Sequence, residues 1–528
     1  MTANSNRLRA KVMQNAIAPR FAHRDLKSTK VRRILSGAMI VTYAICPVAI
    51  AEDALPSAAK PKSESPQVVA LNQKVDGYRG IWYMNQPVKS EYKYKYSGGL
   101  GTYCDYHCPF AIYRPEVNKT FFCYGGAPAD DSRQLLHMVS YFDHATGTVP
   151  RPTLLLDKHT SDAHDNPVMA IDKDGFIWIF STAHGAGRPA YIHRSKKPYD
   201  IDEFERVPAV RRDGDHETPI DNFSYFQIFY DRDAGFRAIF TRYGYPATRT
   251  ACFMSSADGV HWSEWKRLAA IEEGHYQVGA AGHGKLATML NLHPKGKGLN
   301  WRTNLYYLES ADNGANWRTA AGQPIEVPLT VAKNPALVRD YQSEGLLVYL
   351  KDLQFDSDGH PVLVYSTSRD FEPGPASGGH MLTIAHWVDD KWVYHEVTTT
   401  DHNYDSASLS FDKDGTWRII GPTEPGPQPF GTGGEMVMWV SSDQGATWKV
   451  EKQLSAGSEL NHSYARRPVN AHPEFFALWA DGNARKPSDS HLHFCDAKGN
   501  VFKLPTKMEG QTARPQLVTP NSASAGGG

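Results

Sequence analysis

One short turn sequence recurs along the chain and limits the folds that it can adopt. Its form is S-x-D-x-G-x-x-W or a close variant, and it occurs at residues 255–262, 310–317 and 441–448. A related D-x-D-G turn occurs at residues 172–175, 356–359 and 412–415. Gly supplies positive φ and Asp accepts bonds from nearby backbone N–H groups, so both turns suit tight hairpins. Long 3.6-residue hydrophobic periods are scarce, and the chain is therefore predicted to be all-β.

Short strands joined by repeated hairpin turns fit a sandwich, a β-helix or a propeller. A body of roughly 435 residues gives about 62 residues per blade for seven blades and about 72 for six. Four-stranded blades with added loops fit seven better. We therefore predict a single-domain, seven-bladed β-propeller, with six blades as the alternative. The recurrent turns are expected to be structural and to carry no chemistry.

The two ends of the chain differ from this body. Residues 1–51 are predicted to be a signal peptide, because a basic segment precedes a short apolar stretch that ends in Ala49-Ile50-Ala51. A membrane anchor is the alternative, although the stretch is shorter than the about 20 residues that a span needs. We predict secretion or export to the periplasm. Residues 52–75 are predicted to be a flexible linker, 76–510 the propeller and 511–528 a disordered tail.

Charge and cysteine content restrict the partners. Lys+Arg and Asp+Glu are 57 each, and this zero balance argues against a nucleic-acid protein. Removal of the signal peptide takes Cys46 with it and leaves an odd number of cysteines, so not all can pair within the chain. Cys104 and Cys108 flank His107, a pattern that could suggest zinc, but no second ligand pair has a convincing spacing. A disulfide or buried thiols are the preferred interpretation.

Two histidines flank one predicted hairpin. His164 precedes the strand VMAID and His184 follows the strand FIWIF, with the turn at 172–175 between them. Two antiparallel strands return the chain to its starting end, so both imidazoles are expected on one face of the propeller. The same argument applies to Tyr225 and Arg242, which lie on either side of the turn at 231–235.

Four of these side chains form the predicted catalytic set, which is His164, His184, Tyr225 and Arg242. Three further residues are predicted to contact substrate, namely Tyr276, His107 and His293. An Arg on an apolar strand needs an anionic partner, and a substrate carboxylate is one candidate.

The chemistry follows from these residue types. Glycosidases usually need two carboxylates near the sugar bond, and no such pair is evident. No GxSxG elbow, P-loop or GxGxxG sequence is present either. Arg, Tyr and His suit proton abstraction beside a carboxylate, since Arg neutralises the carboxylate while Tyr or His moves the proton. This is the β-elimination reaction of a lyase that acts on uronic acids.

Several segments carry a family resemblance. HDNPVMAIDKDGFIWIFSTAHGAGRPAYIHRS, GHYQVG and NLYYLESADNGANW resemble BNR-4-type repeat proteins, and the turns at 255–262, 310–317 and 441–448 resemble their Asp-boxes. That family includes ulvan lyases of polysaccharide lyase families 24 and 25, which are seven-bladed propellers. It also includes α-L-rhamnosidases of glycoside hydrolase family 145, which act on rhamnose linked to glucuronate. The likeness covers about 76–505.

The resemblance implies a role for each matched residue. By analogy with the ulvan lyases, His164, His184, Tyr225 and Arg242 line the active site, and Tyr276 contacts substrate. By analogy with the rhamnosidases, His107 is catalytic on the opposite face. Retention of both His164 and His184 favours a lyase of rhamnose–uronate polysaccharides, with a rhamnosidase or a non-catalytic glycan-binding propeller as alternatives.

Further expectations concern ligands and assembly. The resemblance implies a structural metal ion, zinc or calcium, whose ligands the sequence does not identify, and no cofactor is required for the chemistry. The expected partner is an acidic polysaccharide, sulfated or not. Neither nucleic acid nor a membrane is expected as a partner after cleavage, and the protein is expected to be a monomer.

Overall fold

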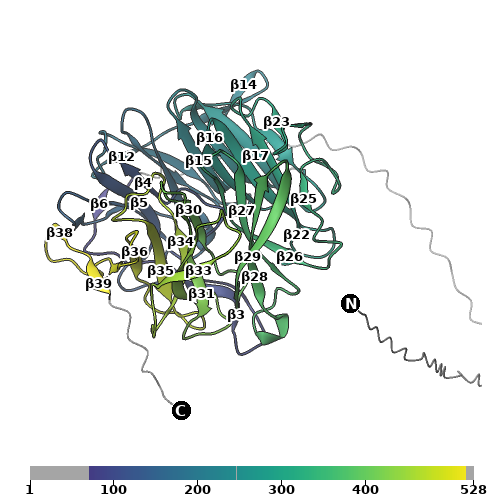
Figure 1. Cartoon of the computed structure of the whole chain (residues 1–528). Helices are drawn as coiled ribbons and strands as arrows, with labels where there is room; N and C mark the ends of the chain where they lie inside the picture. Colours follow the sequence, from purple (N-terminus) through teal and green to yellow (C-terminus); the bar gives the residue numbers. More distant parts are fainter. Residues whose placement is uncertain (1–69, 245, 519–528) are drawn as a thin grey trace, which may run out of the picture. The chain divides into compact units, whose positions relative to one another are not determined.

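Antiparallel β-sheets make up nearly all of the regular structure in residues 70–244 and 246–518, which the computed structural model describes (Figure 1). The helical segments in those ranges are two short 3-10 turns, η1 (Ala163–Asp165) and η2 (Pro375–Ser377). No helix in those ranges is long and apolar enough to cross a membrane. The prediction of an all-β fold is confirmed, whereas the predicted signal peptide at 1–51 lies outside the described residues.

The first three large sheets come from the N-terminal half. The first sheet has the order β1-β8-β6-β5-β4, with β1 (Gln73–Lys74), β4 (Ala111–Arg114), β5 (Lys119–Gly126), β6 (Leu136–Asp143) and β8 (Thr153–Asp157). The second has the order β12-β11-β10-β9, with β9 (Pro167–Ile171), β10 (Ile177–Ser181), β11 (Tyr191–Ser195) and β12 (Phe204–Arg206). The third has the order β15-β16-β17-β19, with β15 (Ser224–Asp231), β16 (Gly235–Tyr243), β17 (Arg249–Ser256) and β19 (Lys266–Ala269).

The remaining large sheets follow in chain order. The fourth contains β20 (Gln277–Gly282), β21 (Lys285–Leu292), β22 (Thr303–Ser310), β23 (Trp317–Arg318), β24 (Pro324–Ile325) and β25 (Leu337–Arg339). The fifth contains β26 (Leu347–Phe355), β27 (Pro361–Ser368), β28 (His380–Val388) and β29 (Lys391–Thr400). A nine-stranded sheet contains β30 (Ser408–Phe411), β31 (Trp417–Pro425), β32 (Gly434–Ser441), β33 (Lys449–Gln453), β34 (Asn461–Arg466), β35 (Ala477–Gly482), β36 (Leu492–Cys495), β37 (Val501–Lys503) and β39 (Gln516–Val518).

Three small sheets complete the described strands. They pair β2 (Trp82–Pro87) with β3 (Tyr94–Gly99), β7 (Val149–Pro150) with β38 (Thr512–Ala513), and β13 (Val210–Asp213) with β14 (His216–Pro219) and β18 (His261–Trp262). Within the nine-stranded sheet, β32 and β34 meet at one residue pair, Gly434 and His462. This sheet is therefore two meanders, β30–β33 and β34–β37 with β39, joined at a single point.

The D-x-D-G turns form tight hairpins, as expected. In the turn between β9 and β10, Asp172 Oδ1 accepts from the backbone N–H groups of Asp174 and Phe176 at 3.0 and 2.9 Å. Gly175 has φ +86°, a conformation that favours glycine. Asp172 Oδ2 accepts from Trp178 Nε1 at 2.8 Å, so one carboxylate fixes both the turn and the following aromatic residue.

Aromatic side chains fill the spaces between neighbouring sheets. Trp178 of the second sheet packs edge-on against Phe236 of the third, with ring centroids 5.0 Å apart. Phe122 of the first sheet stacks on Phe475, which precedes β35, at 5.7 Å. The first sheet and the last meander therefore share a core, and Figure 1 shows the yellow C-terminal strands beside the blue first sheet.

The strands extend beyond the predicted limits of the body at both ends. β1 lies inside the predicted linker at 52–75 and pairs with β8 of the body. β38 and β39 lie inside the predicted tail at 511–528 and pair with β7 and β37. Arg151 donates to the carbonyls of Met508, Glu509 and Gly510 at 2.9–3.0 Å and holds the chain that leads to these strands. A composition rich in polar residues did not reveal this pairing, because an edge strand contributes backbone hydrogen bonds rather than a large apolar face.

Candidate active site

Two imidazoles stack where the first and second sheets meet. His164 lies in η1, just before β9, and His184 follows β10, whose register pairs Ser181 with Pro167 and so returns the chain to its starting end. The ring centroids of His164 and His184 are 3.9 Å apart and their planes differ by 14°. The structure therefore places the two histidines in one cluster.

Asp162 joins both imidazoles. It is the N-cap of η1, and its carboxylate bonds to Nδ1 of His164 and, at 2.8 Å, to Nδ1 of His184. Arg188 also donates to it. Burial raises the pKa of Asp162, but the bonds and charges of His164 and His184 outweigh burial and hold that pKa well below its usual range. An ionised carboxylate on Nδ1 directs the lone pair of each imidazole to Nε2.

The two histidines differ in access to solvent. Nε2 of His164 lies 2.8 Å from the Tyr96 hydroxyl and 2.7 Å from the Tyr103 hydroxyl, and its side chain is 4% exposed. Burial, with a further contribution from His184, lowers the pKa of His164 to about 4, so it is neutral at pH 7. The His184 side chain is 24% exposed, and its Nε2 lies 3.5 Å from the Tyr225 hydroxyl. His184 is therefore the histidine that a substrate can reach.

Three tyrosines continue the cluster. Tyr225 accepts a 3.3 Å bond from Tyr243, and its ring meets that of Tyr276 edge-on at 5.1 Å. Burial raises the pKa of Tyr225 well above its usual value. Burial acts in the same direction on Tyr276, but the guanidinium groups of Arg249 and Arg302 outweigh it and leave its pKa below the usual value. Tyr276 is thus the more acidic hydroxyl of the group.

Two arginines face these tyrosines. Arg302 lies 4.5 Å above the Tyr276 ring and donates to the hydroxyls of Tyr106 and Tyr404 at 3.1 and 2.8 Å. Arg249 begins β17 and lies 5.3 Å above the same ring. Among the described residues, Nε and Nη1 of Arg249 have no hydrogen-bond partner although they are buried. A carboxylate entering the cluster would satisfy these donors.

The cluster opens into a cavity. A pocket of about 120 Å³ is lined by His164, His184, Arg249, Tyr276 and Arg302, among others. Gln86 and Lys95 also line a second cavity of about 500 Å³, so the two cavities are neighbours. A third cavity, of about 440 Å³, shares only Asp105 with the first and contains none of the histidine cluster. The first cavity is the candidate active site, because titratable groups converge there.

The predicted arginine lies outside this cavity. Arg242 donates to the backbone carbonyl and side-chain oxygen of Asn222 at 2.7 and 2.8 Å, and its guanidinium lies 4.2 Å above the Trp265 ring. Strand alternation explains the placement, because neighbouring side chains on β16 point to opposite faces. Tyr243 therefore faces the cluster, and its partner across the strand pair is Arg249. Arg249 therefore lines the cavity, whereas the predicted Arg242 does not.

The other predicted contacts are buried beneath the cavity. His107 and His293 are fully buried, and their ring nitrogens have no hydrogen-bond partner among the described residues. His107 lies 5.8 Å from Tyr225, and burial lowers its pKa to about 3. His293 meets the Tyr276 ring edge-on at 4.8 Å. Both pack against tyrosines of the cluster, and the structure does not place them among the cavity-lining residues.

Sequence reasoning missed several members of the site. They are Asp162, Tyr96, Tyr103, Arg249 and Arg302. Asp162 had a recognisable pattern, because it stands two residues before His164 at the start of a helical turn. The others come from segments distant in sequence, and their convergence is visible only in the folded chain.

The cysteine region shows no metal arrangement. Cys104, Cys108, Cys123, Cys252 and Cys495 are free thiols, and no disulfide occurs in the described part of the chain. Among the residues described, the groups whose spacing could hold a metal ion include Asp162, His164 and His184, but not His107 with its flanking cysteines. Asp162 already accepts from both imidazoles, which accounts for that group without an ion.

Known proteins share sequence and fold with this chain. An ulvan lyase of Alteromonas sp. (strain LOR) is 24% identical over 429 residues, which are 73% of this chain and 82% of the relative. An ulvan lyase of Nonlabens ulvanivorans is 25% identical over 269 residues, which are 45% and 54% of the two chains. A solved polysaccharide lyase of family PL25, an ulvan lyase bound to -[GlcA(1-4)Rha3S]-, has a TM-score of 0.60 at 16% identity and covers 84% of this chain and 98% of its own.

The family assignment rests on a match to a family model. The family model described as "BNR repeat-containing family member" matches residues 139–412, which is more than half of the chain and includes β9–β29 and the histidine cluster. The predicted resemblance to BNR-4-type proteins and to ulvan lyases is confirmed, and the chain belongs to the BNR repeat-containing family.

Proposed function

We propose that this protein is a polysaccharide lyase that cleaves a rhamnose–uronate polysaccharide of the ulvan type by β-elimination. One observation carries the proposal: Asp162 orients His184 toward a cavity that also contains Tyr276 between two arginines. The ulvan lyases similar to this chain support the substrate class, as does the related structure bound to a glucuronate–sulfated rhamnose unit.

The first step concerns the substrate carboxylate. A uronate bound in the cavity places its carboxylate against Arg249 and Arg302, whose charges make the neighbouring C5 proton more acidic. The unpartnered nitrogens of Arg249 provide the hydrogen bonds that this carboxylate needs. Arg302 is already held by two tyrosine hydroxyls, so it contributes charge from a fixed position.

The second step moves the protons. His184 Nε2 takes the C5 proton, and Asp162 stabilises the imidazolium through Nδ1. The C5 electron pair forms the C4–C5 double bond, and the bond from C4 to the glycosidic oxygen breaks. Tyr276 gives its proton to the leaving oxygen. The Tyr225 hydroxyl lies 3.5 Å from His184 Nε2, and its ring meets the Tyr276 ring edge-on at 5.1 Å, so Tyr225 lies between the base and the acid.

The architecture belongs to the same proposal. We propose seven blades, counting the nine-stranded sheet as two, in a propeller closed by packing of the first sheet against the last meander. The cluster then lies at one end of the central channel, where propellers place ligands. We further propose that the protein is a secreted or periplasmic monomer. The arginine-lined cavity supports an acidic polysaccharide, sulfated or not, as its substrate.

Incubation with ulvan and with rhamnosyl-glucuronate oligosaccharides tests this function. The absorbance of unsaturated uronate should rise with time. For His184→Ala, the rate of this rise should be about 100–10,000-fold lower. Free rhamnose without unsaturated uronate, lost in His107→Ala, would instead identify a rhamnosidase. Binding without either product would identify a glycan-binding propeller.

A further inference from the structure

The third cavity, of about 440 Å³, lies at the far end of strands that begin at the candidate active site. Tyr276 lines the first cavity, and residues 278–282 of the strand that follows it, β20, line the third. In β26, Tyr349 lines the first cavity and Phe355 lines the third. An extended strand covers about 20 Å over the six residues from 349 to 355. The proposed reaction therefore makes no use of the third cavity.

Positive charge gathers in this cavity, although Lys+Arg and Asp+Glu are equal in the whole chain. The carboxylates that line it are Asp105 and Asp352. The cationic side chains that line it are Arg114, Lys173, Arg232, Lys351, Arg466 and Arg467. Six cations less two carboxylates leave a surplus of four positive charges. Such a surplus attracts anions.

Both carboxylates are held in bonds to the protein. Asp352 Oδ2 accepts from the backbone N–H of Leu409 at 2.8 Å and so ties β26 to β30. Asp105 Oδ1 accepts from the Ser406 hydroxyl and lies 3.6 Å from Arg466 Nη1. The two carboxylates hold neighbouring segments together, and one of them compensates the charge of Arg466.

Two of the arginines have no carboxylate partner. Arg114 donates to the Ile171 carbonyl, and Arg467 Nη1 donates to the Pro468 carbonyl at 3.3 Å. The Nε atoms of both arginines are buried without a hydrogen-bond partner. Arg232 and Arg466 form ion pairs, whereas Arg114 and Arg467 form none within the described residues. An anion in the cavity would supply the charge that the protein does not.

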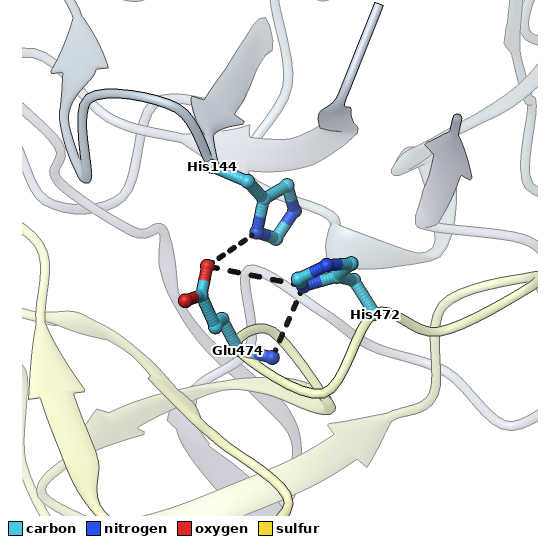
Figure 2. Close-up of side chains that lie close together, drawn as sticks. All are labelled: His144, His472 and Glu474. Atoms are coloured by element: carbon cyan, nitrogen blue, oxygen red, sulfur yellow. Dashed lines mark hydrogen bonds and ion pairs between the residues drawn. The ribbon is translucent and has the colours of Figure 1, made fainter. Parts of the chain in front are cut away.

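The wall that carries Arg467 is fixed at two places. Two residues further on, Val469 forms a parallel bridge with Ile112 of β4. Beyond this bridge, Glu474 Oε2 lies 3.1 Å from Nδ1 of His144, which follows β6 (Figure 2). Both contacts join the connection after β34 to the first sheet. A wall that is already ordered lowers the entropy cost of binding a ligand.

We propose that the third cavity binds an acidic sugar unit, one that carries a carboxylate or a sulfate ester, and does not cleave it. Its volume falls within the range of about 300–1,000 Å³ that small-molecule sites have. Phe229, Tyr230 and Phe355 offer apolar surface to a pyranose ring, and the surplus cations offset its charge. The preference for an anion follows from the cavity alone. The choice of a sugar rests on the proposed function, whose substrate and products are acidic saccharides.

This site differs from the two that the sequence suggested. The first cavity contains the histidine cluster, which the third does not. His107, which the rhamnosidase resemblance makes catalytic, lines none of the three cavities.

Calorimetric titration of the full chain with glucuronate, glucose 6-sulfate and glucose tests the site. The wild type should bind an acidic sugar, and Arg467→Gln should raise the Kd by about 10–100-fold. Glucose should not bind there. Arg212→Gln is the matched control, because Arg212 is exposed, donates to the Gly214 carbonyl at 3.2 Å and lines none of the three cavities.

A second pair of variants changes the charge and removes no contact. Ala281 is exposed and lines the third cavity. Ala281→Glu adds a negative charge there, and Ala281→Gln adds a neutral side chain of the same size. Ala281→Glu should therefore weaken the binding of acidic sugars more than Ala281→Gln does. Arg249→Ala, a change in the first cavity, should leave the Arg467-dependent binding in place, whether or not the protein proves to be a lyase.

Four results would overturn the proposal. The first is equal affinity of the wild type and Arg467→Gln for both acidic sugars, and the second is glucose binding as tightly as glucuronate. The third is equal binding by Ala281→Glu and Ala281→Gln. The fourth is an Arg467-dependent site that takes inorganic sulfate and neither acidic sugar, because the cavity would then hold a simple anion only. Binding of just one of the two acidic sugars supports the proposal and identifies the anionic group.

Discussion

At the scale of single residues, Asp162 positions more of the site's side chains than any single residue predicted from the sequence. Its carboxylate accepts from His164, His184 and Arg188 together. Asp162→Asn replaces one acceptor oxygen by a donor that opposes an imidazole N–H. We expect kcat to fall by about 100–10,000-fold, since the base loses its orientation and charge compensation. Arg188→Ala keeps both imidazole bonds and should cost less than Asp162→Asn in steady-state assays on ulvan; equal losses would assign the effect to Arg188.

The two arginines at the ends of β16 and β17 give a second test. Arg249→Ala removes the unpartnered donors of the cavity and should lower kcat/KM by about 100–1000-fold. Arg242→Ala removes contacts to Asn222 and Trp265 and should lower Tm while keeping most of the activity. Rates are compared after circular dichroism shows that both variants are folded. A larger activity loss in Arg242→Ala would restore that residue to the site.

The pH dependence should report Tyr276. As the proton donor it must be protonated, so kcat/KM falls as pH rises through its pKa. Burial raises this pKa, but the charges of Arg249 and Arg302 lower it by more. The alkaline decline of kcat/KM therefore begins below the ordinary tyrosine value of about 10. Arg249→Gln removes one cation and should move the decline to higher pH. Initial rates of the residual activity across pH measure the shift, and an unmoved decline would assign the acid to another group.

Sequence could find the histidines but not the arginines. His164 and His184 flank a hairpin whose turn can be recognised in the sequence. Their proximity therefore follows from local geometry. Arg242 satisfied the same spacing argument, yet the alternation of β16 directs it away from the cluster. Arg302 comes from a more distant segment, the connection that precedes β22. Side-chain direction and long-range convergence require the register and the packing, which spacing alone does not contain.

At the scale of the element, the Asp-box turn combines hydrogen bonds with packing. Asp312 Oδ1 accepts from Ser310 Oγ at 2.8 Å and from the backbone N–H of Asn316 at 2.8 Å, and Trp317 is buried against Phe253. The structural role expected for this turn matches these contacts. Turn residues are the part of the fold that sequence predicts best, because their conformation depends on neighbours in the chain.

Gly314 in this turn is predicted to be far less replaceable than a glycine elsewhere. Its φ is +82°, and an added Cβ would lie 2.2 Å from Phe253 Cε1. Gly322 has φ +78° with nothing within 4 Å. Gly314→Ala should therefore cost about 1–3 kcal/mol more than Gly322→Ala, the difference being steric overlap rather than backbone strain. Urea midpoints measure both. Similar midpoints would mean that the Phe253 ring moves aside.

At the scale of the whole molecule, composition misplaced both limits of the folded body. Polar, Pro- and Ser-rich ends predicted a linker and a tail, but β1, β38 and β39 pair with strands of the body. Such strands gain stability from backbone bonds, and side-chain composition does not report them. The predicted number of blades came from dividing the length of the body by an assumed repeat length. In the structure, that number depends on counting the nine-stranded sheet as one blade or as two.

Truncation tests whether the C-terminal strands hold the body together. A chain that ends at residue 510 loses the pairing of β38 with β7 and of β39 with β37. It also loses the bond of 2.9 Å from the Arg151 backbone N–H to the Gln511 carbonyl. We expect a lower Tm, because exposed edges of β7 and β37 gain water in place of strand partners and the first sheet loses a tie to the last meander. A chain that ends at residue 518 keeps every one of these contacts and is the control. Equal thermal unfolding of the two chains would show that β38 and β39 rest on the body without stabilising it.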